Sequence, residues 1–169
     1  YEKAASLRDT EQKLIAEFEK ANPNLKVMEM VENRTVYLAM DQFRDELMGS
    51  NIKGKNPLKD KRVRQALYQA VDMAAIEKTV MRGLGKPTGT MIAPMVNGWT
   101  KELGARASKY DVNAAKKLLA DAGYPQGFEL TLDCPNDRYV NDEAICTAIV
   151  PMLARIGIRV TLVAQTRAP

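Results

Sequence analysis

Residues 56–81, NPLKDKRVRQALYQAVDMAAIEKTVM, carry the pattern of two successive amphipathic helices. The first helix has apolar residues spaced three and four apart, so that they share one face: Val63, Ala66, Leu67, Ala70 and Val71. The second helix turns a shorter set inward: Met73, Ile76 and Val80. Asp60 and Asp72 stand where each helix begins and can serve as N-caps, and Gly83 follows the second end. The stretch therefore predicts a helix pair in an α-containing domain.

The residues before this helix pair predict one helix and a hairpin. Residues 4–20 form an amphipathic helical pattern that Asn22-Pro23-Asn24 interrupts. Residues 25–31 and 35–40 alternate between apolar and polar side chains, which predicts two strands joined by a turn. Residues 41–56 are polar and indicate a loop, with a single helical turn at 43–48 as an option.

The residues after the helix pair predict a long loop and then a βαβ unit. Residues 83–109 show little periodicity, and long loops of this kind are often functional. Asp111 caps a helix that Gly123 ends, and a strand at 128–132 follows. A helix at 141–156, with Pro151 inside it, leads to a strand at 158–163. A strand, helix and strand in this order imply a parallel pair.

The predicted fold class is therefore α/β, bordering on α+β, with a small mixed sheet flanked by helices in one domain over residues 1–169. Hydrophobic residues make up 46% and charged residues 27%, which is typical of a globular protein. No apolar run reaches the roughly 20 residues that a membrane span needs. Because the chain starts at Tyr1 rather than Met, we expect it to be an excerpt or a processed protein.

The absence of histidine excludes several classes of site. Ser-His and Cys-His mechanisms and zinc sites with histidine ligands all need a residue that this chain does not contain. None of the three serines lies in a GxSxG motif. We therefore predict no catalytic residue, no metal ligand and no cofactor.

The two cysteines leave two alternatives open. Cys134 and Cys146 are too far apart for a CxxC redox motif. They can form a disulfide if the helix that carries Cys146 packs back beside the strand that ends at Cys134. Two free, half-buried thiols are the alternative that the sequence favours.

Two charged clusters also have alternative interpretations. Residues 53–64 hold six basic residues against one acid, which would suit contacts to a nucleic-acid backbone. Four of these residues flank the apolar helix stripe, so a solvated helix face is favoured. Asp41 and Asp45 could act as an acid–base pair, but nothing in the pattern fixes the two together, and surface acids are favoured.

Four segments, in order, resemble one protein family. They are ANPNLKVMEMVENRTVYLAMD (21–41), NPLKDKRVRQALYQAVDMAAIEK (56–78), YDVNAAKKLLADAGYPQGFELTL (110–132) and PNDRYVNDEAICTAIVPMLARIGIRVTLV (135–163). Together they resemble the extracellular solute-binding proteins of peptide and nickel ABC transporters, the dipeptide/oligopeptide-binding family. The second segment resembles the signature of that family, and Pro151 departs from its usual pattern because a helix-forming residue is expected there.

The resemblance implies a lobe of the type II periplasmic-binding-protein fold, with this chain forming most of the second lobe. The full protein would then be a monomer that engulfs a small peptide or similar solute between two lobes and delivers it to ABC permease subunits. It would not be an enzyme, and nucleic acid would not be a partner. The resemblance places it in the periplasm or outside the cell, associated with the membrane through the transporter, after removal of a signal peptide.

The resemblance also assigns six candidate ligand-binding residues: Asn136, Asp137, Arg138, Tyr139, Asn141 and Asp41. The loop before the helix at 141–156 matches the part that faces the cleft in this family. Arg138 can pair with a ligand carboxylate through two hydrogen bonds, Tyr139 offers a ring and a hydroxyl, and a helix N-terminus favours anions. Alternatively, Asn136 and Asp137 cap the helix and Arg138 neutralises a nearby acid. Trp99 either faces the cleft or pins its loop, and pinning is favoured.

Overall fold

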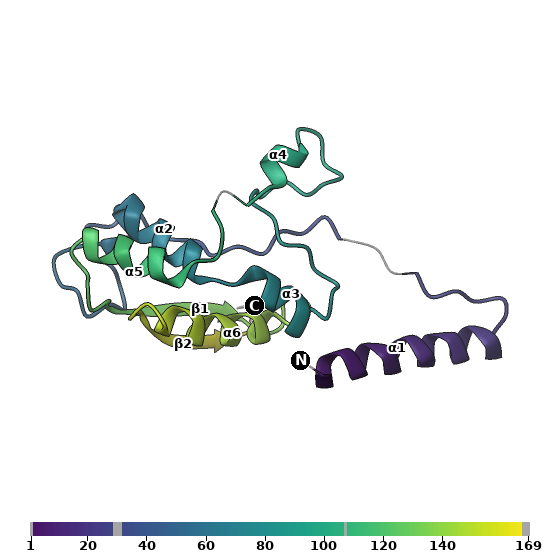
Figure 1. Cartoon of the computed structure of the whole chain (residues 1–169). Coiled ribbons are helices and arrows are strands. Elements are labelled where there is room, and N and C mark those ends of the chain that lie inside the picture. The colour runs from purple at the N-terminus through teal and green to yellow at the C-terminus, as the bar shows by residue number, and fades with distance from the viewer. Residues whose placement is uncertain (1, 29–31, 107, 167–169) are drawn as a thin grey trace. The chain divides into compact units, whose positions relative to one another are not determined.

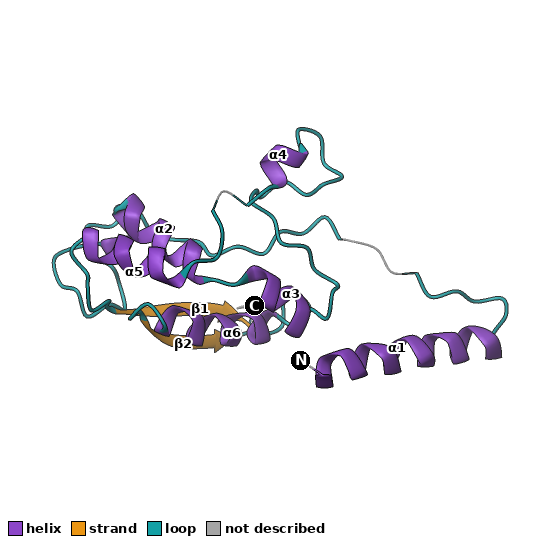
Figure 2. Ribbon diagram, viewed as in Figure 1, coloured by secondary structure: helices purple, strands orange, loops and turns teal. Residues whose placement is uncertain are grey.

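The computed structural model describes residues 2–28, 32–106 and 108–166, and side chains from Thr10 onward (Figures 1 and 2). Its elements are α1 (Glu2–Ala21), η1 (Pro57–Lys59), α2 (Lys61–Ala70), α3 (Met73–Thr79), α4 (Lys101–Gly104), α5 (Val112–Asp121), β1 (Glu129–Pro135), α6 (Asp142–Ala154) and β2 (Arg159–Gln165). The chain divides into two compact units, 1–35 with 74–105 and 36–73 with 106–169. The single domain over residues 1–169 stays a prediction.

The structure confirms the helix pair predicted for residues 56–81. The Asp60 side chain caps α2 by accepting a hydrogen bond from the Arg62 amide, at 2.8 Å. The predicted apolar stripe is buried along its whole length: Val63, Ala66, Leu67, Ala70 and Val71. α3 begins directly after Asp72 and buries Ile76. The Asp60 cap and the apolar periodicity were therefore sufficient to place α2, and the cap predicted at Asp72 stays a prediction.

α2 and α5 pack against each other as an antiparallel pair, side by side in Figure 2. The Asp111 side chain caps α5 through the Ala114 amide, as predicted, at 2.9 Å. Near this end the Asp111 amide donates to the carbonyl of Gln69, in the last turn of α2. At the opposite end an Arg62 guanidinium nitrogen donates to the carbonyl of Asp121. The pair is thus tied at both ends by side-chain and backbone hydrogen bonds.

Arg106 closes the C-terminal end of α2. One of its guanidinium nitrogens donates to the backbone carbonyls of Tyr68 and Val71, and the guanidinium lies 4.7 Å from the centre of the Tyr68 ring. The last carbonyls of a helix have no partner within it, so a cation here stabilises the end.

The predicted βαβ unit is also present. β1 and β2 are parallel, with Leu130 opposite Val160, and α6 packs against both strands (Figure 1). α6 runs without interruption through Pro151, which is exposed. Both strands extend further toward their carboxyl ends than the sequence pattern indicated. The α/β class is confirmed.

The predicted hairpin is wrong where the structure describes it. Residues 25–28 and 32–40 contain no strand, and residues 29–31 lie outside the described residues. Leu25 and Tyr37 are 55% and 59% exposed, so these side chains are not packed in a core. Alternation favours an extended backbone, but a strand also needs a hydrogen-bonded neighbour. The sheet of the described residues is consequently a parallel pair rather than mixed, and residues 43–48 form bends rather than a helical turn.

Two glycines let the strands of the parallel pair begin close together. Gly127 and Gly157 lie just before β1 and β2, with φ of +71° and +86°, in the left-handed region that favours glycine. A β-carbon at position 127 would overlap the backbone carbonyl of Gly157, so the two backbones touch directly. The start of the sheet therefore requires glycine at position 127 for both conformation and space.

Replacing Gly127 by alanine should destabilise the protein by about 2–4 kcal/mol, because it adds both left-handed strain and a backbone clash. Urea-induced unfolding followed by circular dichroism measures the loss. Gly54→Ala is the matched control: its φ is +66°, but a β-carbon there meets nothing within 4 Å. The control should cost only about 1–2 kcal/mol. Equal losses in the two variants would show that the backbones do not touch.

Candidate ligand-binding site

A disulfide encloses the loop that holds five of the six candidate residues. Cys134, near the end of β1, is bonded to Cys146 in α6, with their Cα atoms 6.5 Å apart. The favoured prediction of two free thiols is therefore wrong. Because α6 packs back on β1, its second turn lies beside the end of the strand, and both cysteines are buried there. The residues between the cysteines are held in a closed covalent ring.

Asp142, the first residue of α6, binds the backbone of this loop through its buried side chain. Its side chain is buried, with only 4% of the residue exposed. One carboxylate oxygen accepts hydrogen bonds from the amides of Arg138 and Tyr139, at 2.8 and 3.3 Å, and the other accepts from the Glu143 amide at 2.8 Å. Burial raises the pKa of the Asp142 carboxyl, but these amide donors outweigh it and hold the pKa below its usual value.

The two ends of the loop are fixed by backbone geometry. At its start, the Asn136 amide donates to the carbonyl of Gln165 at the end of β2, at 3.2 Å. At its end, Asn141 occupies the N-cap position of α6 with φ of +60°, and its side chain makes no capping hydrogen bond. Asparagine adopts this left-handed conformation more readily than most residues. The loop therefore turns sharply into the helix at Asn141.

The candidate side chains of this loop face solvent to different degrees. Asn136, Asp137, Arg138 and Asn141 are exposed, and Tyr139 is half-buried. They lie at the carboxyl end of β1 and before the N-terminus of α6, where parallel α/β sheets commonly bind ligands. Five of the six candidates thus lie in one segment of the chain, which the structure places at this end of the sheet.

Asp41 lies in a different setting. Its carboxylate accepts hydrogen bonds from the amides of Phe43 and Arg44 and forms a 2.7 Å ion pair with Arg44. The Arg44 amide, followed by the Phe43 amide and the Arg44 side chain, lowers the pKa of Asp41. The loop 41–56 is anchored near the start of β1, where Asn51 accepts from the Glu129 amide, whereas the loop 136–141 follows its end. The structure does not show Asp41 in one site with the others.

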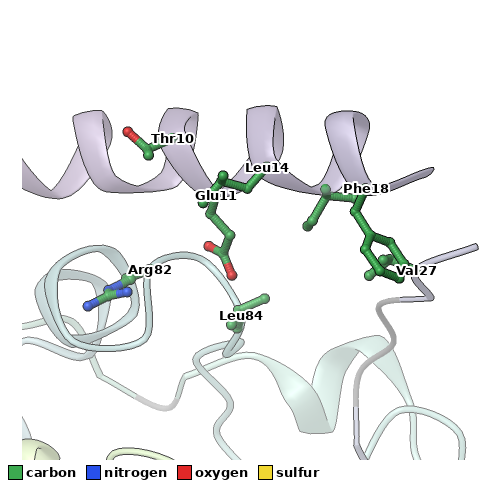
Figure 3. Close-up of a pocket in the computed structure, with 8 residues that line it drawn as sticks. Thr10, Glu11, Leu14, Phe18, Val27, Arg82 and Leu84 are labelled. Carbon is green, nitrogen blue, oxygen red and sulfur yellow. The ribbon is translucent and has the colours of Figure 1, made fainter. Parts of the chain in front are cut away.

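An open hollow in the other unit is lined by none of these residues (Figure 3). Its lining comes from α1, from Val27 and from the turn after α3: Thr10, Glu11, Leu14, Ile15, Phe18, Val27, Arg82 and Leu84. In the same unit the Trp99 ring packs directly on Gly104, which supports the prediction that it pins its own loop. Thr100 caps the short α4 that follows.

Comparison with known proteins identifies the family. The family model described as bacterial extracellular solute-binding proteins, family 5, middle region, matches residues 7–168. This match covers nearly the whole chain. The chain belongs to the family 5 solute-binding proteins.

Individual relatives agree with this membership. The dipeptide-binding protein of Escherichia coli is 35% identical over 112 residues, which are 64% of this chain and 21% of that protein. The solved structure of the PBP AgaA from A. tumefaciens R10, in complex with agropinic acid, matches 65% of this chain and 22% of its own, with 38% identity and a TM-score of 0.58. The dipeptide-binding protein from Pseudoalteromonas sp. SM9913, in complex with Met-Leu, matches 66% of this chain and 22% of its own, with 27% identity and a TM-score of 0.60.

This family 5 chain thus spans about a fifth of the length of the relatives that it matches. The periplasmic-binding-protein fold predicted from the resemblance is confirmed by these solved neighbours. In the described ranges, no helix is long and apolar enough to cross a membrane. No group of three or more acidic or cysteine side chains in those ranges is placed to hold a metal ion.

Most of the basic residues at 53–64 form ion pairs or hydrogen bonds with other residues of this chain. Lys59 pairs with Asp45 at 2.5 Å, Lys53 with Glu46 at 3.7 Å and Arg62 with Asp60 at 2.6 Å. The guanidinium of Arg64 donates to the backbone carbonyls of Leu58 and Lys59. This arrangement fits the solvated helix face rather than a nucleic-acid surface. The Lys59 contact also places Asp45 in an ion pair, which supports its interpretation as a surface acid.

Asp142 does not stand out in the sequence as part of the candidate site. The sequence places it inside the helix predicted at 141–156, where an acid in the first turn is unremarkable because it suits the helix dipole. Only the fold shows that its side chain turns back onto the loop and is buried. A signal was nevertheless present, since Asp142 follows Arg138 by four residues and Tyr139 by three, within reach of a local capping interaction.

Removing the disulfide should destabilise the protein by about 3 kcal/mol, because the bond closes a short ring and restricts the unfolded chain. Cys134→Ala/Cys146→Ala is compared with the parent in urea unfolding. Reductant should destabilise the parent and add the mass of two hydrogen atoms, and it should leave the double variant unchanged. A parent protein that reacts with a thiol reagent before reduction would contradict the bond.

The contribution of the Asp142 carboxylate to stability should depend on pH. Its folded pKa lies below the unfolded value of about 3.9, so its contribution is present above that pH and is lost as the pH falls through the folded pKa. The difference in unfolding free energy between the parent and Asp142→Asn should therefore be constant at neutral pH and shrink below about pH 4. Urea titrations at a series of pH values measure it. A difference that stays constant into strong acid would contradict the lowered pKa.

Proposed function

We propose that this chain is part of the solute-binding component of an ABC importer, which binds a peptide or similar small solute between two lobes. The family match over residues 7–168 carries this proposal. Relatives named for dipeptide and oligopeptide binding support a peptide as the solute. The agropinic acid complex shows that a similar protein binds a different small acid. A free carboxylate is a feature that peptides share with such acids.

The loop 136–141 supplies chemistry suited to a carboxylate. Arg138 offers a planar guanidinium that can bind both carboxylate oxygens, and it is exposed beside the N-terminal end of α6. Tyr139 adds an aromatic face, and Asn136, Asp137 and Asn141 add polar groups that can bind an ammonium or amide. We propose that these five residues contact the solute and that Asp41, which is engaged with Arg44, contributes less directly.

The proposed partners are the solute and the permease subunits of the transporter, to which a closed, loaded protein is presented. The proposed location is the periplasm or the cell exterior. The buried Cys134–Cys146 disulfide supports this location, because structural disulfides persist in oxidising compartments. We further propose that the protein is monomeric and performs no catalysis, in keeping with a chain that has no histidine.

Native mass spectrometry of the full-length protein, purified gently from its source compartment, tests this function. We expect a retained mass on the order of a few hundred daltons that is lost on denaturation and is identified as a peptide or a related small acid. Added Met-Leu should compete for the same site if the solute is a peptide. Co-purified nucleic acid, released by raising the salt concentration, would instead support the basic 53–64 segment as a binding surface. That result would overturn the importer proposal.

A further inference from the structure

The loop 136–141 is held at three separate points, and only one of them lies in its middle. The backbone hydrogen bond from Asn136 to Gln165 fixes its start. The disulfide fixes the elements on either side. The Asp142 carboxylate accepts hydrogen bonds from the backbone amides of Arg138 and Tyr139, and the Asp142 amide donates to the Tyr139 carbonyl. These two residues carry the guanidinium and the ring proposed to bind the solute.

Asp142 is placed to position these residues without touching the solute itself. It is 4% exposed, while Arg138 and its neighbours on the loop surface are open to solvent. Both amides point to the same carboxylate oxygen, so the backbone around residues 138–139 must curl over the side chain. This curl sets the directions in which the Arg138 and Tyr139 side chains leave the loop.

We propose that Asp142 is a positioning residue for solute binding, whose buried carboxylate holds the backbone of Arg138 and Tyr139 in the conformation that receives the solute's carboxylate. The inference rests on the proposed function, because it takes Arg138 and Tyr139 as ligand contacts. An exposed loop that is ordered before binding loses less conformational freedom when the ligand arrives. Asp142 therefore raises affinity by preorganising the loop rather than by adding a contact.

A left-handed turn at Asn141 connects the loop to Asp142. Asn141 stands between the loop and Asp142 with φ of +60°, in the left-handed region, where the chain turns into α6. The side chain of the first helical residue accepts hydrogen bonds from amides of the loop that precedes it. The third hydrogen bond, from the Glu143 amide to the other oxygen, holds the carboxylate in its orientation. An asparagine at 142 keeps the size but offers one acceptor oxygen in place of two.

The test uses the full-length protein and two variants, Asp142→Asn and Asp111→Ala. The second variant removes the side-chain cap of α5, an interaction of the same kind away from the loop, and serves as a control for lost stability. Hydrogen–deuterium exchange by mass spectrometry of peptides that cover residues 135–141 reports on loop order without any ligand. Isothermal titration with Met-Leu reports on affinity, and thermal unfolding shows that each variant is folded.

We expect Asp142→Asn to speed exchange in the 135–141 peptides and to weaken Met-Leu binding about tenfold, which corresponds to about 1.4 kcal/mol. Asp111→Ala should lower the melting temperature but leave both the exchange of the 135–141 peptides and the affinity for Met-Leu unchanged. Unchanged exchange in Asp142→Asn would overturn the proposal, and so would faster exchange with unchanged affinity. If the parent does not bind Met-Leu, the peptide assignment of the proposed function fails, and the exchange experiment still decides whether Asp142 orders the loop.

Discussion

The parallel pairing of β1 with β2 is the constraint on which the rest of their unit depends. Parallel neighbours cannot be joined by a tight turn, so the chain must cross over through α6 before it forms the second strand. The crossover places α6 on both strands, and the short loop 136–141 joins the end of β1 to the start of α6. The loop 136–141, the disulfide and Asp142 all lie at that junction. The position of the candidate site is therefore a consequence of the pairing, and the close approach of Gly127 and Gly157 at the other end permits the pairing.

The junction is stabilised by polar and covalent contacts more than by apolar burial. Five of the six loop side chains are exposed, so the loop gains little from the hydrophobic effect. Instead, amide groups donate to a buried carboxylate, and a disulfide links the flanking elements. Hydrogen bonds to a charged acceptor are stronger than neutral ones. Such a loop can present exposed side chains to a ligand while its backbone stays ordered.

Membership in the family 5 solute-binding proteins gives these contacts a functional setting. The chain spans about a fifth of the length of its relatives, so the loop can supply at most one side of the proposed binding site. Residues 25–28 and 36–37 also expose apolar side chains, which indicates that these segments lack a packing partner among the described residues. Their alternating pattern is that of strands, and in the described residues they lack the neighbour that would complete them. Extended segments of this kind depend on partners distant in sequence.

The sequence by itself determined the elements whose signals are local. Asp60 and Asp111 were predicted to cap helices, and their side-chain hydrogen bonds confirm both caps. The spacing of Val63, Ala66 and Leu67 predicted the buried face of α2. The order of strand, helix and strand gave the parallel pair, because crossover geometry leaves little choice. It also located five of the six candidate site residues in one loop through the family resemblance.

Only the tertiary structure decided how these elements meet. It joined Cys134 to Cys146, left residues 32–40 without a strand partner, and placed Asp41 with Arg44 rather than with the loop 136–141. It also turned Asp142 inward, where the sequence showed an ordinary acid at a helix start. Each of these outcomes depends on groups that the fold brings together, and neither periodicity nor capping along the chain carries information about such distances.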